Sequence, residues 1–291
     1  KYYYELAVKH NNPEAFYNLG YLYYNGYGVK KSIEIAEKYF EKSANLNNTH
    51  GLNALGYLNV AKNGTKEESI KAKECYEKAI KLNNLNSYLN LAYLYIEGIG
   101  VVKDYEKAVM LYQKAASRNH IRALHHLGKM YKKGLGVEKD LNKAREYFEK
   151  AAFLGNMEAA HSLGNLYLHG KGVEVNYRMA RDCYLIAAEQ SNRSSLYKLG
   201  MIYEKGLGVK KDWLKAKVYY ELAAKEGYYS AYINLANFYL NGEYFEVDEE
   251  KAIGYYLKNI STNNEKVIFE RNGFYRTRKN FGYYPSHNDI A

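Results

Sequence analysis

The chain has 291 residues with a formal net charge of +10, and 47% of its residues are hydrophobic. It contains 35 tyrosines and 23 glycines but only 2 prolines and 2 cysteines. This composition excludes a collagen, a disulfide-stapled miniprotein and a polar disordered chain. No run reaches the roughly 18 apolar residues of a membrane-spanning helix, and no signal-peptide pattern opens the sequence.

A period of 36 residues runs through most of the chain, and such a period indicates a repeat architecture. One leucine and one alanine position recur in all seven repeats without an insertion, and most glycines fall into three further positions of the same frame. The leucines are Leu19, Leu55, Leu91, Leu127, Leu163, Leu199 and Leu235, and the alanines are Ala36, Ala72, Ala108, Ala144, Ala180, Ala216 and Ala252.

Residues 1–14 are expected to form the second helix of a preceding partial repeat. Tyr3 and Ala7 hold the positions that Tyr39 and Ser43 hold one repeat later. The chain is therefore expected to begin inside a repeat, with something N-terminal removed or left out.

Each repeat is predicted to form two helices, as repeat four illustrates. In residues 123–133, apolar or small side chains recur with the i, i+3, i+4, i+7 spacing of one buried stripe. The segment 134–137 then breaks the helix, and Asp140 is a good N-cap for a second helix that Gly155 ends. The same position holds the capping residue types Ser32, Asp104, Asn176, Asp212 and Asp248 in five other repeats, whereas repeat two has Glu68 there.

Two helices of about twelve residues cannot bury their apolar stripes alone, so neighbouring repeats must cover them. Small residues such as Gly20 and Ala36 stand where helices must approach closely, and tyrosines such as Tyr23 and Tyr131 are expected to fill wider gaps. The tyrosine richness is therefore interpreted as mostly architectural, and the predicted fold class is all-α.

Repeat four also carries a recognisable pattern, A-x-x-x-L-G-x-x-Y-x-x-G-x-G-V-x-x-D-x-x-K-A-x-x-Y-x-x-x-A-A-x-x-G, from Ala123 to Gly155. Repeats three, five and six match it closely, whereas repeat two departs at Lys62 and Thr65 and is expected to have a looser turn. The pattern resembles the Sel-one-like repeat family, whose α/α units are related in shape to tetratricopeptide repeats.

The resemblance covers residues 15–266 and implies a right-handed superhelical α/α solenoid of seven 36-residue helix-turn-helix repeats. It also implies a scaffold of bacterial type that binds other proteins in signalling, secretion or host interaction. The family pattern implies no catalytic residues.

Residues 267–291 keep no repeat position and mix basic with aromatic side chains, including Arg271, Arg276 and Arg278. They are expected to form either a capping helix with a tail or a second contact surface. A cap is favoured, because the last repeat has an apolar face to cover.

Cys75 and Cys183 share one repeat position three repeats apart, too far for a disulfide, whose Cα atoms lie within about 7 Å. Both are expected to be buried free thiols, which favours a reducing compartment. The predicted location is the cytoplasm, with the periplasm or secretion as the alternative if an N-terminal signal was removed.

His125, His126 and His161 are interpreted as exposed groove histidines rather than metal ligands, because zinc needs three or four converging ligands. The repeated Gly-x-Gly loops follow helices and lack the Lys-Ser/Thr of a phosphate-binding loop. No nucleophile and base are placed together. The sequence therefore predicts no enzyme, no metal and no cofactor.

In stacked hairpins the first helices line a concave groove, and their variable positions are predicted to bind a partner protein or peptide. Asparagine amides are expected to bind an extended backbone, tyrosines to give rigid contact area, and lysines to favour acidic segments. The predicted residues are Tyr17, Asn18, Tyr21, Asn53, Tyr57, Asn90, Tyr93, His125, Lys129, Lys133, His161, Asn165, Lys198, Met201, Asn234 and Asn237.

Two alternatives stay open. The net charge of +10 suits an RNA-binding helical repeat, although the groove positions are not uniformly basic. A structural assembly subunit that self-associates through its atypical ends is the other alternative, and the oligomeric state is left open.

Overall fold

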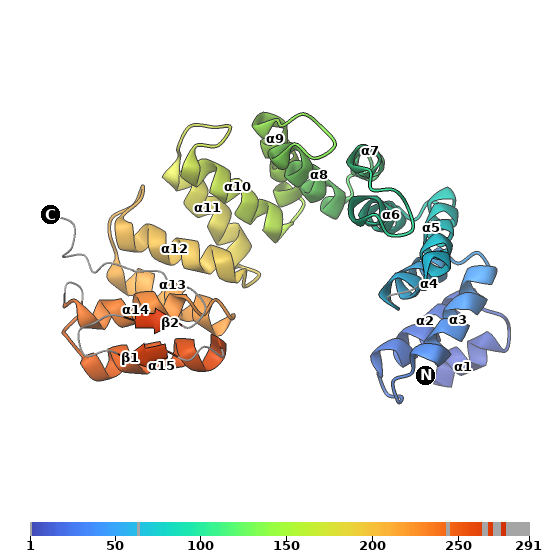
Figure 1. Cartoon of the computed structure of the whole chain (residues 1–291), viewed down its shortest axis with the longest axis horizontal. Coiled ribbons are helices and arrows are strands. Elements are labelled where there is room, and N and C mark those ends of the chain that lie inside the picture. Colours follow the sequence, from blue (N-terminus) through green and yellow to red (C-terminus); the bar gives the residue numbers. More distant parts are fainter. Residues whose placement is uncertain (1, 63–64, 243–244, 264–266, 270–274, 278–291) are drawn as a thin grey trace. The chain divides into compact units, whose positions relative to one another are not determined.

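The computed structural model describes residues 2–62, 65–242, 245–263, 267–269 and 275–277. These residues form fifteen α-helices and one two-stranded sheet. Seven pairs of helices recur with the 36-residue period, and we call the leading member of each pair the first helix and the other the second helix (Figure 1).

The first helices are α2 (Pro13–Asn25), α4 (Thr49–Ala61), α6 (Leu85–Glu97), α8 (Ile121–Lys133), α10 (Met157–His169), α12 (Arg193–Lys205) and α14 (Ala231–Leu240). The second helices are α3 (Ile33–Asn45), α5 (Lys66–Lys81), α7 (Tyr105–Ala116), α9 (Leu141–Phe153), α11 (Tyr177–Ala188), α13 (Trp213–Lys225) and α15 (Glu249–Asn263). Helix α1 (Tyr2–Val8) precedes the first pair, and β1 (Val267–Phe269) and β2 (Tyr275–Thr277) follow the last.

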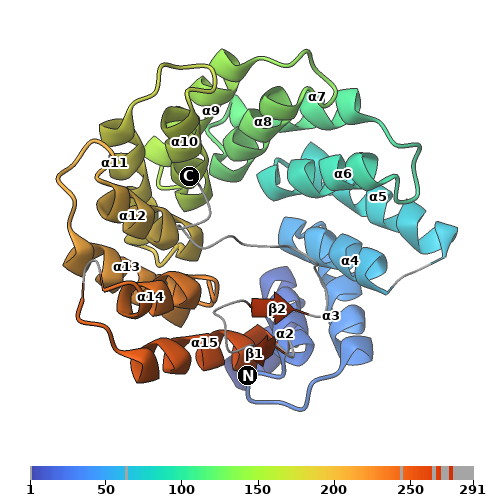
Figure 2. The same ribbon diagram turned by 60° about the vertical axis from the view of Figure 1, so that its left-hand side comes forward.

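The chain divides into two compact units, residues 1–156 (unit 1) and residues 157–291 (unit 2). Within each unit, every first helix packs on the second helix of its own repeat, and that second helix packs on the first helix of the next repeat. In Figure 2, α6 and α8 line the inner side of unit 1, and α5 and α7 its outer side. The predicted α/α solenoid fold is confirmed.

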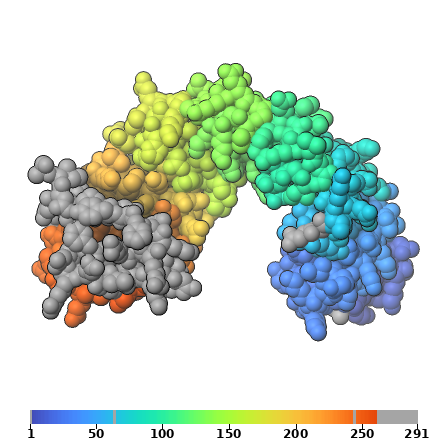
Figure 3. Space-filling view, viewed as in Figure 1, coloured from blue at the N-terminus to red at the C-terminus, as the bar shows by residue number. Residues whose placement is uncertain are grey.

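Within each unit, repeats that follow one another in the sequence also lie next to one another in space, as the order of colours in Figure 3 shows. Helix α1 packs on α2 in the same way that α3 packs on α4. Within each unit, a repeat therefore buries its apolar stripes against the neighbouring repeats, which is the arrangement that the two short helices required.

An aromatic side chain of each second helix packs against a small residue of the first helix in the same repeat. In repeat four the ring of Phe148 is fully buried, and a Cβ added to Gly128 would lie 2.5 Å from that ring. Glycine at this position therefore permits the close approach of α8 and α9. The equivalent aromatic residues are at most 7% exposed in all seven repeats, namely Phe40, Tyr76, Tyr112, Phe148, Tyr184, Tyr220 and Tyr256.

The predicted N-caps of the second helices are confirmed in six repeats. In repeat four the carboxylate of Asp140 accepts a hydrogen bond of 2.9 Å from the backbone N–H of Lys143. This bond satisfies one of the donors that the start of a helix leaves unpaired. The equivalent caps are Ser32, Asp104, Asn176, Asp212 and Asp248.

In repeat two, where Glu68 replaces the capping residue types of the other repeats, the second helix begins differently. Thr65 is the N-cap, its hydroxyl accepts from the backbone N–H of Glu68 at 3.4 Å, and the Glu68 carboxylate accepts from the backbone N–H of Thr65 at 2.9 Å. This reciprocal pair is a capping box, and it starts α5 three residues earlier than the other second helices start. Lys62, where other repeats have glycine, has an ordinary φ of −71°, so this turn differs from the others.

The turn glycine Gly136 is required by its backbone conformation and also by a neighbouring repeat. Its φ is +68°, and a Cβ there would lie 2.3 Å from the carbonyl of Tyr105, where α7 begins. Gly28, the equivalent residue of repeat one, has a φ of +65° but no atom within 4 Å of the corresponding Cβ position. The two glycines therefore differ in their surroundings and not in their conformation.

Strands follow repeat seven, where a capping helix was one expectation. β1 and β2 pair antiparallel, with Ile268 opposite Arg276. Residues 267–269 are β-branched and aromatic, a composition typical of strands. A helix is therefore wrong for residues 267–269 and 275–277, and the rest of the segment 267–291 lies outside the described residues.

We expect Gly136→Ala to destabilise unit 1 more than Gly28→Ala does. Both variants place alanine at a left-handed φ, which costs about 1 kcal/mol. Gly136→Ala also drives a Cβ against backbone atoms, so its total cost should reach about 3 kcal/mol. Urea titrations of the two variants and of the unchanged chain measure these differences. Equal losses for the two variants would contradict the inter-repeat contact.

Candidate partner-binding surface

The sixteen predicted groove residues all lie on first helices, but they fall into two sets. Ten belong to unit 1, on α2, α4, α6 and α8, and six belong to unit 2, on α10, α12 and α14. The two sets are therefore treated as separate surfaces, and their side chains are in very different environments.

Three tyrosines of unit 1 occupy the same position on successive first helices and form what we call the tyrosine ladder. Tyr21, Tyr57 and Tyr93 are 45%, 52% and 49% exposed. Each directly follows the small residue that packs on the second helix, so its side chain points away from that contact. Lys129 is the exposed residue at the same position of α8.

Further aromatic rings surround the first rung of the ladder. Tyr17 is half-buried, and its ring centroid lies 6.3 Å from that of Tyr21 and 5.4 Å from that of His50. The ring centroid of Tyr27 also lies 6.1 Å from that of Tyr21. Burial, followed by the nearby Tyr21 and Glu14, raises the pKa of Tyr17 above its usual value. Tyr17, Tyr21, Tyr27 and His50 therefore form one aromatic cluster at the first rung of the ladder.

The asparagines of unit 1 are only partly available to a peptide. The carboxamide oxygen of Asn53 accepts hydrogen bonds from Ser87 Oγ at 3.0 Å and from Asn90 Nδ2 at 2.9 Å. These bonds join repeats two and three. Asn18 is half-buried at the repeat position of Asn90. The inter-repeat bonds give Asn53 a structural role that the sequence prediction did not anticipate.

The histidines of repeat four are half-buried, so their interpretation as exposed residues is wrong. The ring of His126 stacks on that of Tyr112 at 4.9 Å, and the ring of His125 lies 5.8 Å from that of Phe148. Burial lowers the pKa of both histidines to about 4, and Lys129 adds to this effect. Both imidazoles are therefore neutral at pH 7.

In unit 2 the predicted residues of repeat five bind one another. Asn165 Nδ2 lies 2.9 Å from His161 Nε2, and His161 Nδ1 lies 2.8 Å from Ser195 Oγ. Because an amide nitrogen only donates, Nε2 accepts and Nδ1 carries the proton. Tyr184 Oη donates to the Asn165 carboxamide oxygen at 2.9 Å. His161 is half-buried in this network, which again contradicts the expected exposure.

The asparagines of repeat seven also serve the core. Tyr256 Oη donates to the carboxamide oxygen of Asn237 at 2.7 Å. The Asn234 side chain lies between two phenols, accepting from Tyr197 Oη at 3.4 Å and donating to Tyr220 Oη at 3.3 Å. These contacts hold the first helices to their neighbours, so the two amides have structural partners.

Two predicted residues of repeat six are half-buried side chains of α12, Lys198 and Met201. Burial, followed by the charge of Lys205, lowers the pKa of Lys198. Of the six residues predicted in unit 2, four are therefore bonded to other side chains and two are half-buried.

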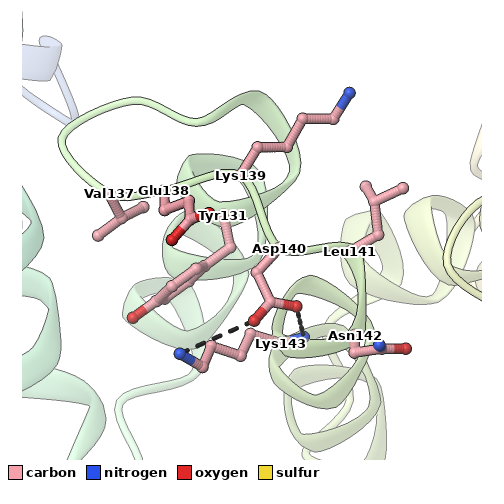
Figure 4. A pocket seen from close by; sticks show the side chains of 8 residues that line it. All are labelled: Tyr131, Val137, Glu138, Lys139, Asp140, Leu141, Asn142 and Lys143. Carbon is pink, nitrogen blue, oxygen red and sulfur yellow. Dashed lines mark hydrogen bonds and ion pairs between the residues drawn. The ribbon is translucent and has the colours of Figure 1, made fainter.

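A hollow of about 660 Å³ lies at the turn between α8 and α9 (Figure 4). In its lining, the Asp140 carboxylate caps α9 and lies 3.7 Å from the Lys143 ammonium, which lies 5.4 Å from the centroid of Tyr131. The same three-residue arrangement recurs in repeats three, six and seven. We interpret the hollow as part of the repeat architecture.

The remaining predicted residues are the three arginines of the C-terminal segment and the two cysteines. Arg271 and Arg278 lie outside the described residues, and Arg276 lies in β2. Both cysteines are free thiols; Cys183 is buried, whereas Cys75 is half-buried, and burial raises its pKa to about 11.

Two features are absent from the part of the chain that the structure describes. No group of three or more His, Cys, Asp or Glu side chains there could hold a metal ion. No helix in the same part is long and apolar enough to cross a membrane.

One sequence signal for the unit 2 contacts was overlooked. Asn165 and Asn237 each stand 19 residues before a core tyrosine, Tyr184 or Tyr256. An asparagine on the first helix combined with tyrosine at the core position of the second helix therefore predicts a bond inside the repeat. Unit 1 has tyrosine or lysine at the equivalent first-helix position.

We expect His125→Tyr/His126→Asn, which installs the residues of other repeats, to reduce the loss of stability in mild acid. Between pH 6.5 and about 4 the unfolded chain binds protons that the folded histidines do not, so the free energy of unfolding falls as the pH falls. Each histidine should account for about 2 kcal/mol between pH 7 and pH 5, so the pair should account for about 4 kcal/mol.

Urea titrations at pH 7 and pH 5 test this difference. The chain with both histidines should lose more stability on acidification than the double variant. Parallel losses would show that these histidines are not held neutral by the fold. Carboxylates are the same in both proteins, so they cancel in the comparison.

The chain was also compared with known families and proteins. A family model described as Sel1 repeat matches residues 13–48, 50–84, 85–120, 121–156, 158–192, 193–228 and 230–258. No curated protein matches the chain. The matched segments coincide with the seven helical pairs and confirm the resemblance to Sel-one-like repeats.

Two solved structures show the same kind of repeat. A protective antigen of uropathogenic Escherichia coli strains, which displays an SLR fold, is similar with a TM-score of 0.77 and 27% identity; the match covers 90% of this chain and 56% of that one. This chain thus spans little more than half of that antigen's length. A Sel1 repeat protein from Oxalobacter formigenes has a TM-score of 0.58 and 33% identity, over 69% of this chain and 85% of that one.

Sel1 repeats are helical units commonly used as scaffolds for protein–protein interaction. Here seven of them, matched in sequence and folded as seven helical hairpins, make up most of the chain. The chain therefore belongs to the Sel1 repeat family.

Proposed function

We propose that this protein is a non-enzymatic scaffold that binds a partner protein through the first-helix face of unit 1. The observation that carries the proposal is the tyrosine ladder, in which Tyr21, Tyr57 and Tyr93 each leave about half of the side chain exposed at one repeated position. The contact surface also includes Tyr17, Asn18, Asn90, His125, Lys129 and Lys133.

Exposed tyrosines at regular spacing suit protein recognition. A phenol ring offers a large apolar face and a hydroxyl that donates and accepts, and it loses little side-chain entropy on binding. The core positions of the repeats already contain their own aromatic residues, so the ladder has no equivalent packing role. This separation between core and surface tyrosines supports a contact surface.

The environments of the reactive side chains support a non-enzymatic role. His125 and His126 are held neutral among rings, His161 is bonded to Ser195 and Asn165, and burial raises the pKa of Cys75. A general base needs a pKa near the working pH, and a nucleophilic thiol needs a lowered one. The pKa values of His125, His126 and Cys75 are shifted away from these requirements.

We further propose that the protein works in a reducing compartment, the cytoplasm. The support is the pair of free thiols, one buried and one half-buried, in a chain whose repeats are held together without disulfides among the described residues. Oxidising compartments favour disulfide-bonded small domains.

We expect Tyr21→Ala/Tyr57→Ala/Tyr93→Ala to weaken partner binding by at least about tenfold, since buried aromatic contacts are typical binding hot spots. The partner is first identified by affinity purification and mass spectrometry, then purified and titrated against each variant. The matched control is Tyr2→Ala/Tyr3→Ala/Tyr177→Ala, which removes three exposed tyrosines elsewhere. Unchanged affinity for the ladder variant would reject this surface.

A further inference from the structure

Charge is distributed very unevenly over the first helices of unit 1. Helices α2, α4 and α6 contain no lysine or arginine, and their only carboxylates are Glu14 and Glu97. Helix α8 contains no carboxylate and four cations, namely Arg122, Lys129, Lys132 and Lys133. Three first helices that carry aromatic residues but no cations are therefore followed by one basic helix.

The rungs of the ladder have a spacing that can be estimated from helix packing. Helix α2 contacts α4 directly, and α4 contacts α6. Helices in contact lie about 8–10 Å apart, so successive rungs recur about every 10 Å. A polyproline II peptide has three residues per turn and a rise of about 3.1 Å, which gives a turn of about 9 Å. One turn of such a peptide is therefore about as long as the spacing between two successive rungs.

We propose that the first-helix face of unit 1 binds an extended proline-rich segment in the polyproline II conformation, with acidic residues at the end that lies over α8. The inference rests on the proposed function and specifies the chemistry of the partner. The apolar part of the segment lies across Tyr21, Tyr57 and Tyr93, and its carboxylates lie near Arg122, Lys129 and Lys133.

Tyrosine side chains suit the apolar part of this ligand. Proline rings pack on flat aromatic faces, as in other aromatic-lined grooves that bind proline-rich peptides. A proline peptide has carbonyl acceptors but no backbone donors, and the ladder offers phenol hydroxyls that donate. The ligand is also pre-formed in the bound conformation, so little chain entropy is lost.

The cations of α8 suit the acidic end. Arg122, Lys129 and Lys133 are exposed, and the ion pairs between described residues do not include any of the three. Acidic side chains of a ligand would therefore meet three free cations on one helix. The same cations repel a basic ligand, so they also contribute to specificity.

The charge pattern disfavours single-stranded RNA, which also stacks on aromatic side chains. RNA carries a phosphate at every nucleotide, and its binding depends on cations along the whole path. The ladder helices α2, α4 and α6 supply none. An uncharged proline segment fits these three repeats better.

The test uses the whole chain and fluorescein-labelled synthetic peptides in fluorescence anisotropy titrations. The probes are nine prolines followed by four glutamates, and four glutamates followed by nine prolines, since a polyproline II helix can bind in either direction. The controls are nine prolines with four lysines, and a Gly-Ser peptide of equal length with four glutamates. We expect one acidic proline peptide to bind at least about tenfold more tightly than both controls.

Variants separate the two parts of the surface. Tyr57→Ala should weaken the proline peptide about tenfold, whereas Tyr3→Ala, at an 81% exposed tyrosine of α1, should not. Lys129→Glu/Lys133→Glu should remove the preference for glutamate over lysine. Its matched control is Lys114→Glu/Lys150→Glu, which makes the same charge change on exposed lysines of α7 and α9.

Each outcome decides between the hypotheses. Acidic proline peptides that bind no better than the Gly-Ser control, or equally well to Tyr57→Ala, overturn the inference. If the ladder variant still loses the purified partner in that case, the scaffold function stands and only the ligand class is wrong. Binding of labelled poly(U) that is tighter than that of either proline peptide and weakens steeply with salt would also overturn the inference in favour of RNA.

Discussion

The fold depends on one contact that recurs in every repeat: an aromatic ring of the second helix against a glycine or alanine of the first. The ring fills the space that a side chain on the first helix would otherwise occupy, as the clash of a Cβ at Gly128 with Phe148 shows. This contact fixes which side of the first helix faces the core. The next residue lies about 100° further around the helix, and in repeats one to three it is a tyrosine that leaves about half of its side chain exposed.

The identity of the core ring then affects the first-helix residue that directly follows the glycine or alanine. Phenylalanine, as at Phe40 and Phe148, needs no polar partner, whereas the hydroxyls of Tyr184 and Tyr256 are satisfied by Asn165 and Asn237. A buried hydroxyl without a partner costs about 1–3 kcal/mol, so an asparagine bound to it is retained for stability. The asparagine at this position in repeats five and seven is therefore explained by its bond to the core tyrosine. Unit 1 has tyrosine or lysine at the same position.

The sequence was sufficient for the parts of the fold that depend on local chemistry. The 36-residue period, the helical stripes and the six Asp, Asn or Ser caps follow from spacing and from hydrogen bonding within a few residues. In repeat two, Glu68 stands at the position of the other caps, and Thr65 three residues earlier is the N-cap, which comparison with the other repeats does not indicate. The contact of Gly136 with Tyr105 joins two repeats and has no signal within a single repeat.

The candidate site was harder to predict for the same reason. Variable first-helix positions were all treated as groove residues, and this correctly placed them on first helices. It could not separate Tyr57, which is half-exposed, from Asn53, whose amide bonds to Ser87 and Asn90 in the next repeat. Burial of His125 and His126 likewise depends on rings of neighbouring helices, which the repeat pattern alone does not place.

Nearest-neighbour packing also determines how binding and stability are linked. Each repeat contacts the repeats before and after it within its unit, so local opening of one hairpin breaks the surface on both sides. A ligand that spans α2 to α8 is held by four repeats together, and the opening of any one of them would release part of it. Its binding free energy therefore adds to the cooperativity of unit 1, by RT ln(1 + [L]/Kd) for a ligand that binds only the folded unit. A partner that binds across successive repeats thus couples the opening of each of these repeats to the opening of the others.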